Sequence, residues 1–218
     1  MSERENILEL KNVVYSFHTY GGEVKAVRDV SYEVRQGEIL GIVGESGCGK
    51  SVTAQCILRL NPEPPGFFEG GEILYKGQDV LKMSKKEIRK IRGREIGFVF
   101  QDPMTSLNPT MRVGAQIEEV FLGRTDVSKK EVKERAMDIM RLVGISDVEK
   151  RYKQYPHELS GGMKQRVMIA IALVGSPSIV IADEPTTSLD VTIEAQILDV
   201  LKNLQKTLGT SIILITHD

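Results

Sequence analysis

The segment Glu38–Leu60 constrains the fold of this chain more than any other. An apolar strand, Glu38–Val43, runs directly into the glycine-rich loop Gly44–Ser51 (GESGCGKS), and a helix with one apolar face follows until Asn61-Pro62. The loop fits the pattern GxxxxGK(S/T), in which backbone N–H groups and the dipole at a helix start hold phosphate oxygens. We therefore predict an α/β domain that binds a nucleotide through Gly44–Ser51, which we call the phosphate loop.

The residue types within the phosphate loop predict separate roles. We expect Lys50 to reach the β- and γ-phosphates, and the Ser51 hydroxyl to take one Mg²⁺ position. Glycine is required wherever a side chain would block the approach of phosphate to the backbone. The residues predicted to contact the nucleotide here are Gly44, Glu45, Ser46, Gly47, Cys48, Gly49, Lys50, Ser51 and Val52.

Composition narrows the class of protein. The 218 residues carry 29 Lys and Arg against 30 Asp and Glu, so the net charge gives no reason to expect nucleic acid or an anionic membrane as a partner. No apolar run approaches the roughly 20 residues that span a bilayer, and the N-terminus MSEREN has no leader pattern. Cys48 and Cys56 form neither a disulfide framework nor a paired metal-ligand set, which fits a reducing cytosolic compartment.

The first hundred residues are mainly strand-like. Strands are expected at Leu8–Tyr15 and Val24–Val34, around the turn Tyr20-Gly21-Gly22. Gly71–Tyr75 and Ile96–Phe100 indicate two more, with a basic helix at Ser84–Arg92 between them. We expect this latter region to belong to a mixed or antiparallel sheet.

The rest of the chain alternates between helices and strands. Asp102–His157 is helical in pattern and is the candidate for an inserted subdomain; within it Ser128 and Glu131 form a capping box before an apolar stripe that ends at Gly144. Later helices are expected at Val167–Val174 and Thr192–Leu208, and strands at Ile179–Ala182 and Ser211–Thr216. This alternation is typical of a parallel sheet covered by helices.

Two acids follow the apolar strand IVIA. Asp183 is the candidate Mg²⁺ ligand, because a carboxylate at the end of a buried strand beside a phosphate loop is placed to hold the metal. Glu184, one residue further on, is aimed differently and is the candidate to polarise an attacking water. Gln101 ends another strand, and its amide could complete magnesium or water coordination. His217 follows the last strand, where it is either incidental or in contact with the γ-phosphate.

A second glycine turn, Leu159–Met163 (LSGGM), precedes another helix. The Ser160 hydroxyl and the N–H groups of Gly161 and Gly162 could bind a γ-phosphate. Taken in isolation, Ser-Gly-Gly before a helix is more often a plain helix cap, so both interpretations stay open.

The order of these motifs resembles the nucleotide-binding domain of ATP-binding cassette (ABC) proteins over nearly the whole chain. The resemblance implies Gln101 as the Q-loop glutamine, Ser160–Gly162 as the signature, Asp190 as the D-loop aspartate and His217 as the switch histidine. It implies Ser51, Gln101 and Asp183 around Mg²⁺, and an aromatic ring on adenine, for which Phe17 is the first candidate and Tyr20 the second.

The resemblance also implies a fold. It is an α/β P-loop NTPase core with a mostly parallel sheet, an N-terminal antiparallel β-subdomain and an inserted α-helical signature subdomain. We expect one domain over residues 1–218, with strands and the P-loop core in 1–101, the helical subdomain in 102–160, and the signature helix with the remaining core in 161–218. Because family members continue past the switch histidine, we expect the chain to be truncated at its C-terminus.

A finer resemblance is to the D-type ATPase subunits of bacterial dipeptide and oligopeptide importers, through RGREIGFVFQDPMTSLNP, YPHELSGGMKQRVMIA and ADEPTTSLDVTIEAQIL. Such subunits hydrolyse ATP and close head to tail in pairs, which implies a second copy or a paralogous F-type subunit as partner. Two membrane permease subunits are expected near Asp102–Phe121, an extracytoplasmic solute-binding protein indirectly, and no nucleic acid. The expected location is the cytoplasmic face of the membrane, as a peripheral subunit that is soluble when isolated.

Other functions remain open on the sequence. The same type of subunit could serve nickel or another small solute, or the chain could be a fragment that binds nucleotide without hydrolysing it. A chromosome-maintenance or translation ATPase of the same superfamily is a further alternative. About a hundred residues between Lys50 and Leu159 leave no room for long coiled-coil arms, and a second cassette is missing.

Overall fold

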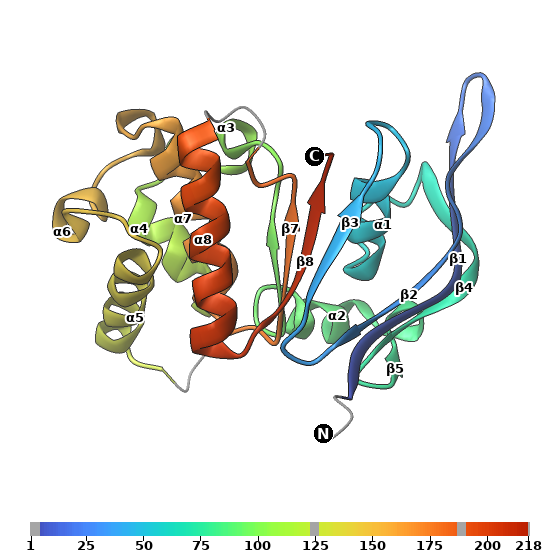
Figure 1. Ribbon diagram of the computed structural model, residues 1–218, viewed down its shortest axis with the longest axis horizontal. Helices are drawn as coiled ribbons and strands as arrows, with labels where there is room; N and C mark the ends of the chain where they lie inside the picture. The colour runs from blue at the N-terminus through green and yellow to red at the C-terminus, as the bar shows by residue number, and fades with distance from the viewer. Residues whose placement is uncertain (1–4, 123–126, 187–190, 218) are drawn as a thin grey trace.

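Two four-stranded sheets and a group of helices make up the computed structural model of this chain, which describes residues 5–122, 127–186 and 191–217. In Figure 1 the antiparallel sheet lies on one side, the parallel sheet in the middle and helices α4 to α8 on the other side. Helices α1 (Lys50–Ile57) and α2 (Lys85–Ile91) lie between the two sheets. The fold is the predicted α/β arrangement of a parallel core with an antiparallel sheet beside it.

The antiparallel sheet has the strand order β2-β1-β4-β5. Its strands are β1 (Asn6–Thr19), β2 (Gly22–Arg35), β4 (Gly66–Tyr75) and the short β5 (Gln78–Asp79). β1 and β2 form a long hairpin in which Thr19 pairs with Gly22, so the turn predicted at Tyr20-Gly21-Gly22 is confirmed. The register also places Phe17 opposite Val24.

The parallel sheet has the order β3-β8-β7-β6. Its strands are β3 (Ile39–Val43), β6 (Ile96–Val99), β7 (Ile179–Asp183) and β8 (Ser211–Thr216). The expectation of a mixed or antiparallel sheet was wrong for Ile96–Val99, because β6 pairs in parallel with β7. Pairing with a strand some eighty positions further along leaves no mark on the local pattern.

The helices after β6 follow the predicted periodicity. They are α3 (Pro103–Ser106), α4 (Val113–Glu118), α5 (Lys129–Leu142), α6 (Val148–Arg151), α7 (Gly161–Leu173) and α8 (Val191–Leu208), with the 3₁₀ turns η2 (Glu119–Phe121) and η3 (Pro156–Glu158) among them. The 3₁₀ turn η1 (Val80–Lys82) lies earlier in the chain, before α2. Ser128 caps α5 by accepting from the Glu131 N–H at 3.2 Å. The Glu131 carboxylate accepts from Arg135 at 2.7 Å, whereas the predicted capping box would have directed it back to Ser128.

Two cores explain why strand β7 is buried along its whole length. Val180 and Ala182 face the core formed with the helices, while Ile179 and Ile181 face the core shared with α1 and the antiparallel sheet. Successive strand residues point to opposite faces, so a strand between two cores must be apolar at every position. Within the described residues no helix is both long and apolar enough to cross a membrane.

Candidate functional site

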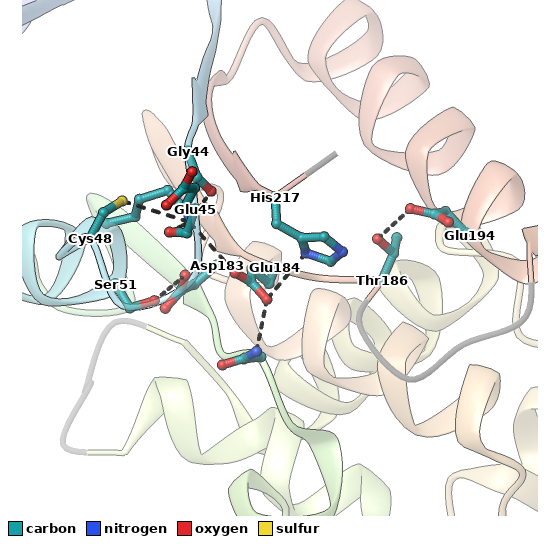
Figure 2. A network of polar contacts seen from close by, with 11 residues as sticks. Gly44, Glu45, Cys48, Ser51, Asp183, Glu184, Thr186, Glu194 and His217 are labelled. Atoms are coloured by element: carbon teal, nitrogen blue, oxygen red, sulfur yellow. Dashed lines mark hydrogen bonds and ion pairs between the residues drawn. The ribbon is translucent and has the colours of Figure 1, made fainter.

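Four parallel strands end at one edge of their sheet, and each is followed by a predicted site residue. Gly44 follows β3, Gln101 follows β6 after Phe100, Glu184 follows β7 and His217 follows β8. Ligands bind at this carboxyl edge in parallel α/β sheets, because the strand ends and helix starts meet there. Figure 2 shows Gly44, Asp183, Glu184 and His217 close together at this edge.

The phosphate loop is folded around the ammonium group of Lys50. Lys50 Nζ donates to the carbonyl oxygens of Gly44 at 2.6 Å and Glu45 at 2.8 Å, and 7% of its side chain is exposed. Gly49 has φ +95°, and a Cβ built on it would lie 2.2 Å from the Ala26 carbonyl oxygen of β2. The glycine is therefore required for the contact of the loop with the antiparallel sheet, in addition to any approach of phosphate.

Ser51 and Asp183 come together as the sequence predicted. Ser51 Oγ donates to Asp183 Oδ1 at 2.9 Å, and Asp183 is 3% exposed. Burial is the largest cause that raises the pKa of the Asp183 carboxyl; the Ser51 hydrogen bond lowers it and the neighbouring Glu184 charge raises it.

These two side chains fit a magnesium ion. A buried carboxylate without a strong counter-charge favours a cation, and a hydroxyl beside it supplies a second oxygen ligand. Mg²⁺ commonly takes one or two carboxylates and fills its octahedron with substrate phosphates and water. The described residues hold no group of three His, Cys, Asp or Glu side chains around one point, so a cage made of protein ligands alone is absent from this part of the chain.

Glu184 is the centre of the polar network. Its Oε2 accepts from Gln101 Nε2 at 2.8 Å and lies 3.6 Å from His217 Nδ1, and its Oε1 lies 4.0 Å from Lys50 Nζ. The backbone explains this direction: Glu184 has φ +43°, and its N–H donates to the Ile215 carbonyl at 3.0 Å. This left-handed backbone conformation directs the Glu184 side chain differently from that of Asp183. Strained backbone conformations of this kind are concentrated at functional sites.

A cavity of about 730 Å³ lies over the phosphate loop, which is within the usual size range of ligand pockets. Its lining includes the loop residues Ser46 to Thr53 together with Gln101 and Glu184. Its second wall comes from β2, through Val24, Lys25, Ala26, Val27, Arg28 and Val30. This wall could not be predicted from the strand pattern, because an ordinary strand pattern does not reveal which ligand the strand faces. Two cations three residues apart, Lys25 and Arg28, were the available signal.

The two candidate aromatics differ in their positions. Phe17 packs edge-on against Tyr15 with ring centroids 5.3 Å apart, and it lies opposite the cavity-lining Val24. Tyr20 is fully exposed at the hairpin turn. Among the described residues, neither side chain lines the cavity itself. A stacking role for either ring stays a prediction.

The second glycine turn forms the start of helix α7. Ser160 Oγ accepts from the Met163 N–H at 3.4 Å, which is the helix cap weighed in the sequence analysis. Ser160 and Gly161 are exposed, and Gly162 is buried against Ile193 of α8. In the described part of the chain none of these three residues lines the cavity over the phosphate loop. The helix cap is therefore the role that the structure shows, and phosphate binding at this turn stays a prediction.

The predicted D-loop residue Asp190 lies outside the described residues. Of the described residues near the segment 187–190, Thr186 Oγ1 donates to Glu194 Oε1 at 2.8 Å, as Figure 2 shows.

Comparison with known proteins agrees with this geometry. A profile of the family described as "ABC transporter" matches residues 27–187. The oligopeptide transport ATP-binding protein OppD of Bacillus subtilis is 58% identical over 97% of this chain and 59% of that protein. The dipeptide transport ATP-binding protein DppD of the same species is 52% identical over 98% of this chain and 64% of that protein. The chain thus spans about three fifths of the length of these curated relatives.

Solved structures show the same fold. The ATP-binding cassette MJ0796, in a dimeric post-hydrolysis state bound to ADP and Pi, superimposes with a TM-score of 0.85 at 31% identity, over 97% of this chain and 88% of that one. CbiO1 of Clostridium perfringens, part of the transporter complex cbiONQ, superimposes with a TM-score of 0.80 at 30% identity, over 99% and 80%.

Proposed function

The chain belongs to the ABC transporter family, and on that premise we propose that it binds and hydrolyses ATP to drive an importer of dipeptides or oligopeptides. The observation that carries the catalytic part is the position of Glu184. Its carboxylate faces the cavity beside the phosphate loop and is held by Gln101, Lys50 and His217 within 4.0 Å.

These contacts suit hydrolysis of a terminal phosphate. Lys50 binds the β- and γ-phosphates, and Ser51 with Asp183 would hold Mg²⁺, which neutralises phosphate charge when bound. Glu184 orients the attacking water and accepts its proton, while Gln101 and His217 fix the direction of the Glu184 carboxylate. Asp190 keeps its predicted role as part of this proposal.

The complete site requires a second ATPase subunit. Ser160 and Gly161 are exposed at the start of α7 and lie outside the cavity of their own chain, which supports their use on a nucleotide held by a partner. The helix N-terminus supplies N–H groups and partial positive charge for that purpose. We propose a head-to-tail pair with a second copy or a paralogous F-type subunit, closed by ATP. The dimeric state of MJ0796 supports this arrangement.

The transport part rests on the relatives. The names of OppD and DppD support peptides as the cargo of the assembly, with an extracytoplasmic solute-binding protein as an indirect partner. We propose that two membrane permease subunits bind near Asp102–Phe121, where Met104 is 66% exposed and Leu122, just beyond, is 72% exposed. With those subunits as partners, the proposed location is the cytoplasmic face of the membrane. We keep the division into 1–101, 102–160 and 161–218 as part of the proposal.

Substitution of Glu184 tests catalysis. Glu184→Gln keeps the side-chain shape but removes the base, so ATP turnover should fall by about 10²- to 10⁴-fold while ATP affinity is retained. ATP should then hold the variant as a dimer in sedimentation velocity. Glu134→Gln, at an exposed position of α5, is the matched control and should turn over ATP like the parent. Unchanged hydrolysis in Glu184→Gln would refute the catalytic assignment.

Uptake by cells that lack the gene tests the cargo. Loss of labelled tripeptide uptake, restored by the gene, supports peptide import. Loss of nickel uptake with normal peptide uptake would contradict it and favour the nickel alternative. ATP binding without turnover in the parent protein would instead favour a nucleotide-binding chain that does not hydrolyse.

A further inference from the structure

A second cavity, of about 240 Å³, lies away from the nucleotide site. It is lined by Arg59, Asn61, Glu63, Lys85, Ile88, Arg89 and Arg92. Arg59 and Asn61 follow the C-terminal end of α1, and the last four residues of this lining belong to α2 or its end. Figure 1 shows α2 next to the end of α1 that is remote from the phosphate loop. No role assigned so far uses this cavity.

The lining of this second cavity is strongly basic. It contains four cations, Arg59, Lys85, Arg89 and Arg92, and a single carboxylate, Glu63. Within the described ranges none of the four cations forms an ion pair. Four like charges around a small space repel one another, so an anion in that space would lower the electrostatic free energy.

Two of the guanidinium groups are held in place by the backbone. Arg92 Nε donates to the Leu58 carbonyl at 2.9 Å and its Nη2 donates to the Arg59 carbonyl at 2.6 Å. Arg59 Nη1 donates to the Met83 carbonyl at 2.9 Å. Burial, followed by the charges of Arg59 and Arg89, lowers the pKa of Arg92. The remaining N–H groups of both arginines are thus preorganised, which reduces the cost of binding a ligand.

A purely structural role explains only part of this arrangement. Arg92 satisfies carbonyls at the end of α1, where a cation is favourable. That role does not account for Lys85 and Arg89, which are exposed residues of α2 that also line the cavity. Lys86 and Lys90 lie on the same helix and are exposed but do not line it. The cations on α2 are therefore divided between the cavity and open solvent.

We propose that this cavity binds a small phosphoanion, such as inorganic phosphate, pyrophosphate or the phosphomonoester of a headgroup. Guanidinium groups bind phosphate through paired N–H donors, and Lys85 adds a mobile charge at the rim. The volume is below the range for drug-sized ligands and suits one or two phosphoryl groups with water. Asn61, 7% exposed, forms a rigid part of the wall because its Nδ2 donates to the Val52 carbonyl of α1 at 3.2 Å.

Glu63 gives the proposal a specific signature. It is the one acidic residue among the described residues lining the cavity, and its negative charge opposes an incoming anion although it forms no ion pair with the four cations. Removing its charge with Glu63→Gln should therefore tighten anion binding several-fold. A nonspecific effect of surface charge would be too weak to give this change at physiological salt.

Titration calorimetry with inorganic pyrophosphate tests the site. The full chain carries Lys50→Ala, so that the phosphate loop contributes little to pyrophosphate binding. Its affinity is compared with that of the same chain carrying Lys85→Ala and Arg89→Ala together. Because both substitutions remove charged hydrogen bonds to the anion, binding should weaken at least tenfold. The control pair Lys86→Ala and Lys90→Ala removes the same charge from the same helix and should change affinity less than twofold.

Vesicles distinguish the two sources of the anion. If the ligand is a headgroup, the chain should sediment with phosphatidic acid vesicles and not with phosphatidylcholine vesicles. Lys85→Ala and Arg89→Ala should then reduce the fraction of protein that sediments with phosphatidic acid. Pyrophosphate binding without such vesicle binding assigns a free anion. The proposal is overturned if neither probe depends on Lys85 and Arg89 more than on Lys86 and Lys90. Thermal unfolding of every variant confirms that the exposed substitutions leave the fold intact.

Discussion

Replacing Gly49 with alanine separates two reasons for a glycine in the phosphate loop. The added Cβ would lie 2.2 Å from the Ala26 carbonyl oxygen, and φ at this position is +95°. The first number reports a collision with β2, and the second reports a backbone conformation that side chains rarely adopt. Both must be relieved by moving the loop, the strand or both.

The size of the effect follows from these two terms. The two atoms must separate by about 1.2 Å to reach an ordinary contact of 3.4 Å, and the atom in the way is backbone, so it cannot rotate aside. Overpacking of this kind typically costs about 1–3 kcal/mol, and a non-glycine residue at positive φ costs about 1–2 kcal/mol. We therefore expect the free energy of unfolding to fall by about 2–5 kcal/mol, which lowers Tm by roughly 5–15 °C.

Two other glycines supply matched controls. Gly47 has φ +80° but open space around its Cβ position, so Gly47→Ala should lose about 1–2 kcal/mol from the backbone term alone. Gly41 has no restricted φ and no atom within 4 Å, so Gly41→Ala should stay within about 0.5 kcal/mol of the parent. Urea unfolding measures the free energy of unfolding of the three variants, and binding of a fluorescent ATP analogue measures the nucleotide affinity of the phosphate loop.

Equal losses in Gly49→Ala and Gly47→Ala would refute the argument. The contact between the phosphate loop and β2 would then contribute nothing beyond the backbone conformation. We expect the free energy of unfolding to be lowest in Gly49→Ala, higher in Gly47→Ala and highest in Gly41→Ala. Nucleotide affinity should also fall most strongly in Gly49→Ala.

Two further predictions concern buried ionisable groups. The pKa of Asp183 is raised above its ordinary 3.8, mainly by burial, so its ionised form destabilises the nucleotide-free protein at pH 7. Asp183→Asn should therefore raise Tm at pH 7 in scanning fluorimetry, and the increase in Tm should disappear as the pH falls towards 3.8. The same substitution should lower Mg²⁺-dependent ATP turnover at least tenfold. A lower Tm at pH 7 would contradict this account. Burial raises the pKa of the Cys56 thiol to about 12, whereas Cys48 is exposed and lines the nucleotide cavity. A thiol reagent at pH 8 should therefore label Cys48 quickly and Cys56 only after unfolding. ATP should slow the labelling of Cys48. Two fast thiols in the native protein would be the contrary result.

Much of the secondary structure could be predicted from local pattern. The alternation in β1 and β2, the apolar stripe of α5 and the stop at Gly144, which has φ +80°, all depend on residues a few positions apart. The sheet to which Ile96–Val99 belongs was predicted wrongly, because its partner β7 is distant in the chain. Strand pairing over such separations is chosen by the packing of the whole core.

The candidate site divides in the same way. Ser51 and Asp183, predicted with Gln101 as Mg²⁺ ligands, have Oγ and Oδ1 2.9 Å apart, since a phosphate loop and an acidic strand end have fixed positions relative to a parallel sheet. The wall from β2, whose only local signal was the pair Lys25 and Arg28, and the basic cavity beside α2 were not predicted. Both depend on side chains that approach one another across two different sheets or helices.

The sequence by itself determined which residue types stand at the candidate site: a glycine-rich loop before a helix, an acid at the end of an apolar strand, and a second acid one residue further on. Those features can be recognised from residue types at short spacing, because backbone amides, hydroxyls and carboxylates within one segment act over a few ångströms. The tertiary structure alone decided that Gln101, Lys50 and His217 converge on Glu184, and that Gly49 must fit against Ala26. These contacts join residues up to 134 positions apart, and they exist because parallel strands end at a common edge while the antiparallel sheet packs over it.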